Sequence, residues 1–174
     1  VEGDLSFTEA PKAFVATVLF SDLKGFTAMS NKLPAAKVGK LLNQYFEVMT
    51  EIVFEHQGTL DKFIGDAMMV LFGAPLEMSP NEQANRAAQC ALAMQAAVSQ
   101  LDAAWEAEGL APPSCRIGIH QGPVVVGNFG SQRRSDYTAI GTTVNLAARL
   151  ESVCAAGEAL ISVDIANFLD ENTF

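Results

Sequence analysis

The sequence is poor in basic residues and in cysteine, and it has no long apolar run. Eleven Lys and Arg stand against 20 Asp and Glu, which gives a formal net charge of −9. Such a chain lacks the broad cationic surface that neutralises a nucleic-acid backbone, so we expect no nucleic-acid partner. No apolar stretch reaches the roughly 18 residues of a membrane-spanning helix, and the first residues lack the layout of a signal peptide. We therefore expect a cytoplasmic domain whose present segment makes no membrane contact.

Cysteine and histidine are too few and too scattered to predict a metal cluster or a disulfide framework. Cys90, Cys115 and Cys154 have no metal-type spacing, and their odd number fits a reducing compartment. We interpret them as small core residues. His56 and His120 have no partner motif beside them, so we assign neither to catalysis.

The length and composition predict one globular domain. The chain has 174 residues and is 49% hydrophobic, which is enough for a sizeable core and too apolar for a disordered segment. It begins with Val and a polar stretch, VEGDLSFTEAPK. We expect residues 1–12 to lead from an upstream sensor or membrane region, and residues 13–174 to form the domain.

The periodicity of apolar residues predicts alternating strands and helices. A strand is expected at 13–20, and a β-hairpin at 59–72. SPNE at 79–82 is a capping box that opens a helix running toward Glu108. The remaining predicted elements are a helix from Pro34 to about His56, a second hairpin over 114–129 that turns at Gln121 and Gly122, a polar loop, a helix from Thr142 to Cys154 and a strand around 158–162. The pattern predicts an α+β fold with helices packed on one sheet.

Two acids occupy positions that suggest a site. Asp22 directly follows the first strand and Asp66 lies in the turn of the first hairpin, so adjacent antiparallel strands would bring both carboxylates to one rim. Two hard oxygen donors suit Mg²⁺ or Mn²⁺, particularly when substrate phosphates complete the coordination. The alternative is structural, with Asp22 capping a helix and Asp66 filling a turn. Spacing alone leaves both interpretations open.

Three stretches in order, LFSDLKGFTAMS, DKFIGDAMMVLFGAP and DYTAIGTTVNLAARLE, resemble the motifs of class III nucleotidyl cyclase catalytic domains. The resemblance covers about 150 residues, from Ala13 to Ser162. It implies a ferredoxin-like, palm-type βαββαβ sandwich with a mostly antiparallel central sheet, working as a dimer with interfacial active sites. It also implies cyclisation of a nucleoside triphosphate by attack of the ribose 3′-hydroxyl on the α-phosphorus.

The resemblance assigns metal ligands and a phosphate-binding turn. Asp22, Asp66 and the backbone carbonyl of Leu23 match the positions that hold two divalent cations, one acting on the 3′-hydroxyl and the other on the triphosphate. Gly25, Phe26 and Thr27 form a glycine-opened turn whose free N–H groups could bind phosphate, and the family uses the turn in this way. A tight turn that simply requires glycine is compatible with the same residues.

Two further positions match the residues that read the purine. Lys62 stands four residues before Asp66, and Thr138 stands three before Gly141. Adenine presents an acceptor at N1 and a donor at its exocyclic amine, which complement a Lys donor and a Thr acceptor. Guanylate cyclases of this family typically carry Glu at the position of Lys62, so the chain resembles an adenylate cyclase acting on ATP.

Thr138 departs from the Asp that many adenylate cyclases carry at this position. Thr is similar to the subgroup that includes the bicarbonate-responsive soluble and the cyanobacterial enzymes, which makes bicarbonate regulation a further hypothesis. Because a Thr hydroxyl accepts less strongly than a carboxylate and can also donate, it predicts the base less sharply.

Asn145 and Arg149 match the transition-state residues of the family, and their spacing puts them on one helix face. Asn145 would orient the ribose, and Arg149 would stabilise developing phosphate charge. Family geometry places these two, with Lys62 and Thr138, opposite the two aspartates of another protomer. Since one chain carries both sets, we expect a homodimer with two active sites.

Three alternatives remain: a guanylate cyclase, a silent regulatory cyclase-like module, and a diguanylate cyclase, whose hairpin would read Gly-Gly-Asp/Glu-Glu-Phe instead of Ile-Gly-Asp-Ala. Family members usually continue into a strand pair whose Lys contacts the triphosphate. The sequence stops at Phe174 before such a pair, so these C-terminal strands are expected to be missing.

Overall fold

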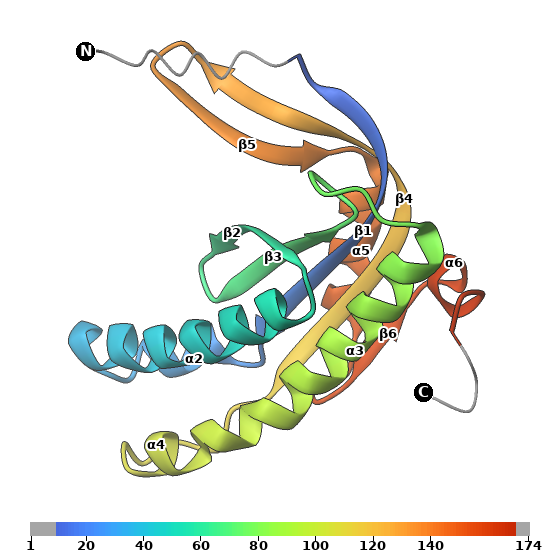
Figure 1. The fold of residues 1–174 in the computed structure, drawn as a ribbon. Helices are drawn as coiled ribbons and strands as arrows, with labels where there is room; N and C mark the ends of the chain where they lie inside the picture. Colours follow the sequence, from blue (N-terminus) through green and yellow to red (C-terminus); the bar gives the residue numbers. More distant parts are fainter. Residues whose placement is uncertain (1–9, 170–174) are drawn as a thin grey trace.

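A computed structural model describes residues 10–169 and shows a six-stranded sheet with helices on both faces (Figure 1). The strands are β1 (Lys12–Leu23), β2 (Thr59–Ile64), β3 (Ala67–Phe72), β4 (Cys115–Ser131), β5 (Arg134–Ile140) and β6 (Ala159–Ile161). The sheet order is β2-β3-β1-β4-β5, with β6 on β4. The β4–β6 pair is parallel and the others are antiparallel. The predicted α+β fold with a mostly antiparallel sheet is confirmed.

Six helices and one 3-10 turn connect the strands in the described part of the chain. They are α1 (Phe26–Ser30), α2 (Ala35–Glu55), α3 (Pro80–Val98), the 3-10 turn η1 (Ser99–Leu101), α4 (Asp102–Glu106), α5 (Thr142–Val153) and α6 (Val163–Ala166). Ser79 caps α3 as predicted, because its hydroxyl accepts a hydrogen bond from the Glu82 N–H at 3.2 Å, while the Glu82 carboxylate accepts from Arg86. The predicted helix toward Glu108 is divided by η1, and Trp105 is buried on α4. No helix in residues 10–169 is long and apolar enough to cross a bilayer.

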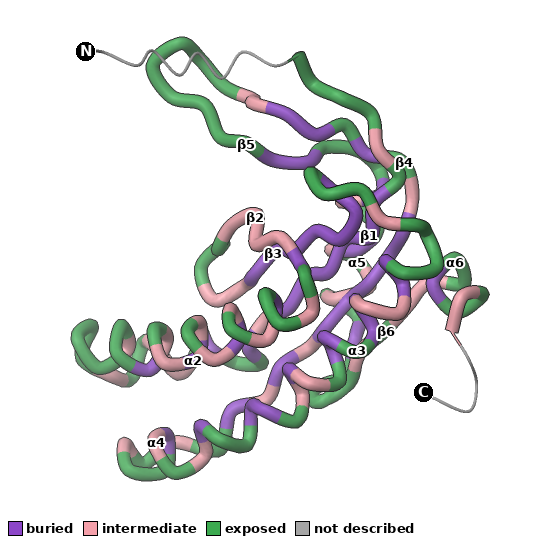
Figure 2. The backbone as a smooth tube through the Cα atoms, viewed as in Figure 1, coloured by how far each residue is buried: buried purple, intermediate pink, exposed green. Residues whose placement is uncertain are grey.

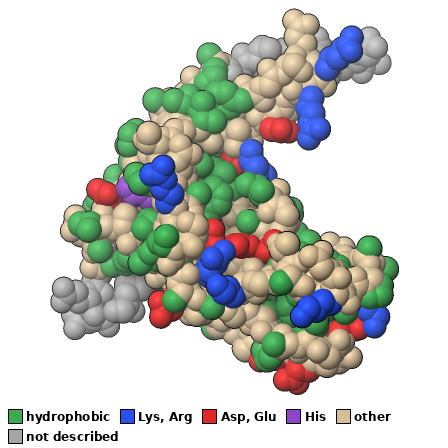
Figure 3. All heavy atoms as spheres, turned by 180° about the vertical axis from the view of Figure 1, so that it is seen from behind, with side chains coloured by type: hydrophobic (Ala, Val, Ile, Leu, Met, Phe, Trp, Pro, Cys, Tyr) green, Lys and Arg blue, Asp and Glu red, His purple; other side chains and the backbone are tan. Residues whose placement is uncertain are grey.

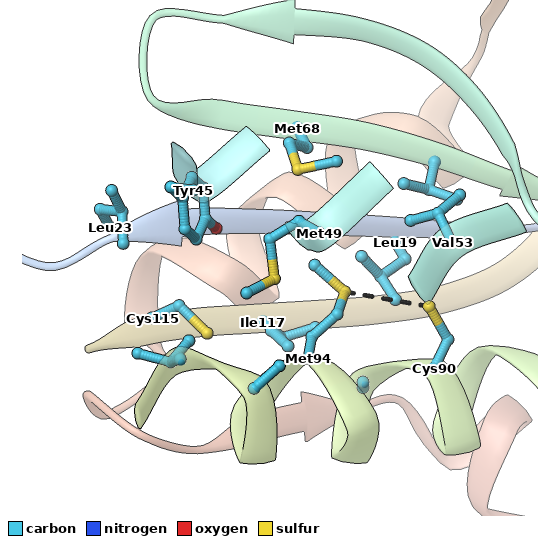
Figure 4. Close-up of a cluster of buried hydrophobic side chains, with 14 of the residues drawn as sticks. Leu19, Leu23, Tyr45, Met49, Val53, Met68, Cys90, Met94, Cys115 and Ile117 are labelled. Atoms are coloured by element: carbon cyan, nitrogen blue, oxygen red, sulfur yellow. Dashed lines mark hydrogen bonds between the residues drawn. The ribbon is translucent and has the colours of Figure 1, made fainter. Parts of the chain in front are cut away.

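The core has two layers, one on each face of the sheet. Figure 2 shows that buried residues gather along the central strands. On one face α2 and α3 cover β1, β3 and β4, and Figure 4 shows the buried side chains that meet there, among them Tyr45, Met49, Met94 and Ile117. On the other face Ala147 of α5 packs against Val18 and Phe20 of β1. Both faces of β1 are therefore buried, which explains its continuous apolar run.

The prediction of a hairpin turn at Gln121 and Gly122 was wrong. β4 runs straight through these residues and pairs with β1 from Cys115 to Val126. Gly122 is not in a turn. It allows α5 to pack closely on β4, because a Cβ atom there would lie 2.7 Å from the Thr143 hydroxyl of α5. The Gln121 side chain is buried, and its amide donates a hydrogen bond to the Thr17 hydroxyl at 2.8 Å.

The hairpin that does follow lies in the segment predicted as a polar loop. Ser131 of β4 pairs with Arg134 of β5, so two residues, 132 and 133, make the turn. Most of β5 is exposed, and its polar composition conceals a strand whose buried residues are Thr138 and Ala139. The predicted N-terminal segment, residues 1–12, falls mostly outside the described residues, and β1 begins at Lys12.

Candidate active site

Asp22 and Asp66 meet at one end of the central strands, where β1 ends and β3 begins. Asp22 lies near the end of β1, and Asp66 lies in the two-residue turn between β2 and β3, after Gly65, whose φ is 63°. β1 and β3 are antiparallel neighbours, and Ser21 pairs with Met68. The Leu23 N–H donates to Asp66 Oδ2 at 3.2 Å. The predicted meeting of both acids at one rim is observed, and α1 begins four residues after Asp22 with Gly25 as its N-cap, so Asp22 does not cap it.

The ionisation of Asp66 is disfavoured by its surroundings. Burial, a hydrogen bond with Asp22 and the charge of Asp22 together raise the pKa of Asp66 to about 7. Such a pair is suited to a divalent cation, whose charge offsets the repulsion and whose preferred ligands are carboxylate oxygens. Among residues 10–169 no three His, Cys, Asp or Glu side chains cluster as a metal site. The pair therefore fits ions whose remaining ligands come from a substrate and from water.

Arg116 is a charged neighbour that the sequence interpretation missed. It pairs with Asp22 across β1 and β4, and its Nη2 donates to Asp22 Oδ2 at 2.7 Å. The same nitrogen lies 2.9 Å from Glu151 of α5. Arg116 therefore links Asp22 of β1 to Glu151 of α5 through two ion pairs. The sequence alone does not predict the ion pair with Asp22, because its partners are 94 residues apart. The pair becomes predictable only when the register between β1 and β4 is known.

A second cluster forms where β2 and β5 approach each other. The Thr138 hydroxyl donates to the Asp61 carboxylate, with distances of 2.7 and 3.0 Å to its two oxygens. The Ala139 N–H donates to Asp61 Oδ2 at 3.2 Å, and Lys62 Nζ lies 3.6 Å from Asp61 Oδ1. The structure thus brings the two predicted base-reading residues together around an acid that the sequence interpretation did not single out.

A pocket of about 440 Å³ lies beside this cluster. Lys62 and Phe63 of β2 line one wall, and Asp136 and Tyr137 of β5 line the other. Figure 3 shows a hollow between the projecting β4–β5 arm and the body of the molecule, with acidic and basic side chains along it. The pocket is open to solvent and large enough to receive part of a small ligand.

Asn145 and Arg149 lie on the exposed side of α5. Ala147, between them, faces the sheet and is fully buried, whereas both polar residues are exposed. The helix is anchored at its start, where the Thr143 hydroxyl donates to the Pro123 carbonyl at 2.7 Å. Both predicted transition-state residues are therefore available to a ligand or to another protomer.

The GFT turn has the conformation that requires glycine. Gly25 has φ 72°, in the left-handed region, and α1 starts at the next residue. Phe26 is buried in the core and holds the turn in place, while Thr27 is exposed. The first internal hydrogen bond of α1 runs from the Met29 N–H to the Gly25 carbonyl, so the N–H groups of residues 26–28 precede it. The predicted phosphate contact is compatible with this geometry.

The histidines and cysteines have structural surroundings. His56 Nδ1 lies 2.8 Å from the Ile52 carbonyl, and His120 Nδ1 lies 2.8 Å from the Ser162 hydroxyl. All three cysteines are free and buried, as predicted. Burial raises the pKa of the Cys90 and Cys115 thiols to about 12, which makes them unreactive.

Comparison with known proteins identifies related domains. The profile of the family described as adenylate and guanylate cyclase catalytic domain matches residues 9–174. Adenylate cyclase 1 of Rhizobium meliloti is 37% identical over 137 residues, which are 79% of this chain and 20% of that protein. The adenylyl cyclase CyaB from P. aeruginosa superposes with a TM-score of 0.89 and 42% identity, covering 92% of this chain and 82% of that one. The guanylyl cyclase Cya2 gives 0.88 and 39%, covering 94% and 82%.

The overall likeness is shared by adenylyl and guanylyl cyclases. The chain spans about a fifth of the length of the first curated relatives it matches. The adenylyl and the guanylyl cyclase structures are almost equally similar to it. The choice of base must therefore be argued from individual residues in the pocket.

Proposed function

Because the chain belongs to the adenylate and guanylate cyclase catalytic domain family, we propose that it converts ATP to 3′,5′-cyclic AMP and pyrophosphate as a homodimer. The observation that carries the choice of ATP is the cluster of Lys62, Thr138 and Asp61 beside the pocket. Lys62 donates to N1 of adenine and Thr138 accepts from the exocyclic amine. Guanine would set its N1–H donor against the Lys62 ammonium.

The metal half of the site consists of Asp22, Asp66 and the Leu23 carbonyl. These groups would hold two divalent cations, Mg²⁺ or Mn²⁺, which when bound acidify the ribose 3′-hydroxyl and offset the charge of the triphosphate. The N–H groups of Gly25, Phe26 and Thr27 bind the phosphates. The raised pKa of Asp66 supports this role, because a bound cation would favour the ionised form of this carboxylate.

The remaining half comes from the partner protomer. Its Asn145 equivalent orients the ribose, and its Arg149 equivalent stabilises the charge that develops on the phosphate during attack. Exposed apolar side chains lie close to Lys62, Thr138 and Asn145 in sequence. They support a dimer interface at the surface that carries these three residues. The apolar residues are Phe63, Ile64, Tyr137, Ile140 and Leu146, each more than 40% exposed.

Specific observations bear on two alternatives. A guanylate cyclase is supported by the 39% identity to Cya2, but Lys62 opposes guanine. A silent regulatory module is opposed by the presence of both aspartates with Asn145 and Arg149 in one chain. Bicarbonate regulation through the Thr138 subgroup, a cytoplasmic location and a fused upstream sensor or membrane region stay predictions.

The test is product formation by purified protein. The purified protein, supplied with ATP or GTP and Mn²⁺ or Mg²⁺, is expected to form cyclic AMP in preference to cyclic GMP. Absence of product from either nucleotide at micromolar enzyme would refute the cyclase proposal. A preference for GTP would refute the base assignment alone.

A further inference from the structure

We propose that Asp61 is a specificity-determining positioning residue that turns the Thr138 hydroxyl into an obligate acceptor and thereby selects adenine over guanine. The inference rests on the proposed cyclase function and concerns a residue that opens the second motif, DKFIGDAMMVLFGAP, and to which the resemblance gave no role. It follows from the contacts of Asp61, its burial and its place in β2.

Asp61 is sequestered and has defined partners. Its side chain is 1% exposed, although it lies on the edge strand of the sheet. The pairing of β2 with β3 shifts between Leu60 and Lys62, so Asp61 is the bulged residue. A bulge redirects a side chain out of the regular alternation of a strand. Asp61 and Lys62, neighbours in sequence, can therefore both serve the pocket.

The hydrogen-bond inventory determines the direction of each bond. A carboxylate only accepts, so the single hydroxyl proton of Thr138 must point at Asp61, whose oxygens are 2.7 and 3.0 Å away. The Thr138 oxygen is then left with lone pairs alone for any further partner. Such an oxygen accepts from the exocyclic amine of adenine and has no proton for O6 of guanine.

The ammonium group of Lys62 is paired with the same acid. Its Nζ lies 3.6 Å from Asp61 Oδ1, and its side chain is 37% exposed, so the ammonium reaches the pocket while its charge is partly balanced. Asp61 thus orients one donor and one acceptor, the pair that adenine requires. The ambiguity of a Thr hydroxyl, which by itself can donate or accept, is removed by this buried neighbour.

The test is the ratio of kcat/KM for ATP to kcat/KM for GTP in Asp61→Asn. An Asn amide can donate to the Thr138 oxygen and release its proton toward guanine O6, so we expect the ratio to fall about tenfold or more, as for loss of one buried hydrogen bond. Thr138→Ser, which keeps the hydroxyl, should retain the wild-type ratio, and Thr138→Val should lose it. In the Thr138→Val background Asp61→Asn should change the ratio no further, because the two residues act as a unit.

Asp136→Asn is the matched control, since it removes one negative charge from the pocket wall and leaves the hydrogen bond between Thr138 and Asp61 in place. An equal shift of the ratio in Asp136→Asn and Asp61→Asn would overturn the proposal, as would an unchanged ratio in folded Asp61→Asn. If Asp61→Asn does not fold, equal ratios in Thr138→Ser and Thr138→Val overturn it.

Binding separates this proposal from the cyclase activity. Affinities for 3′-deoxy-ATP and 3′-deoxy-GTP, which cannot cyclise, should show the same loss of preference in Asp61→Asn. Wild-type protein that makes no cyclic product but binds 3′-deoxy-ATP preferentially, with that preference lost in Asp61→Asn, would refute the activity and retain the role of Asp61. Preference of the wild type for the guanine analogue would refute the role.

Discussion

At the scale of single residues, the site holds charges that the fold alone would not favour. Asp66 lies beside Asp22, and burial together with the neighbouring carboxylate raises the pKa of Asp66 to about 7. Arg116 offsets part of the charge of Asp22 through a bond of 2.7 Å. A site arranged for cations therefore reduces the stability of the cation-free protein, as is common where function and stability compete.

Asp66→Asn should stabilise the metal-free protein at alkaline pH. A folded-state pKa raised from 3.8 to about 7 means that the native state binds the proton more tightly than the unfolded chain, so stability falls as pH rises from about 4 to about 7. Solvent screening of this partly buried group reduces the full effect, and we expect a gain of about 1–2 kcal/mol at pH 8 that vanishes below pH 4.

Urea denaturation in EDTA at pH 5 and pH 8 measures this difference. Asp136→Asn, an exposed acid of β5, serves as the control and should follow the wild type at both pH values. A variant Asp66→Asn that is less stable than the wild type at pH 8 would contradict the conclusion that ionised Asp66 destabilises the metal-free protein.

At the scale of elements, β4 organises the site through two close approaches to α5. A Cβ atom on Gly118 would lie 2.1 Å from the Glu151 backbone nitrogen and 2.5 Å from the Ala147 carbonyl. Gly122 allows a similar approach to Thr143 at the other end of the helix. Because α5 carries Asn145 and Arg149, these glycines set the height of two predicted catalytic residues above the sheet.

Gly118→Ala is therefore expected to cost about 1–3 kcal/mol of stability or more, because backbone atoms of α5 cannot rotate away from the added methyl group. Gly39→Ala is the matched control. Gly39 is exposed on α2 and has no heavy atom within 4 Å of an added Cβ, so the change should stabilise by about 0.5–1 kcal/mol through helix propensity. Thermal and urea unfolding of both variants test the contrast; equal effects would exclude close packing as the reason for Gly118.

At the scale of the whole molecule, one chain carries two half-sites that the proposed dimer brings together. Asp22 lies near the end of β1 and Asp66 lies just before the start of β3, and the two meet there. Lys62 and Thr138 lie around Asp61, between β2 and β5. A twofold axis would place each half opposite its complement, so a homodimer would have two equivalent sites.

Mixing Asp22→Ala protein with Arg149→Ala protein should restore activity. Each variant alone should be nearly inactive, whereas random exchange makes half of the dimers mixed, each with one intact site, or about a quarter of the wild-type activity. Cyclic AMP formation after subunit exchange measures this. Mixing Asp22→Ala with Asp66→Ala is the control and should restore nothing, because both changes affect the same half-site. Inactivity of the first mixture despite proven exchange would refute the shared site.

The sequence by itself determined the alternation of elements, the N-cap at Ser79 and the meeting of Asp22 with Asp66, because each depends on local periodicity, turn chemistry or the pairing of adjacent strands. It failed at Gln121 and Gly122, where a polar residue and a glycine imitate a turn but serve packing inside β4.

Only the tertiary structure decided the partners of those residues. Arg116 reaches Asp22 across 94 positions of sequence, and Asp61 reaches Thr138 across 77. Such contacts depend on strand register and on a bulge, which are properties of the assembled sheet and leave no local pattern. The physical reason is that periodicity reports which face of an element is apolar, whereas the identity of a buried acid's partner is set by the element packed against it.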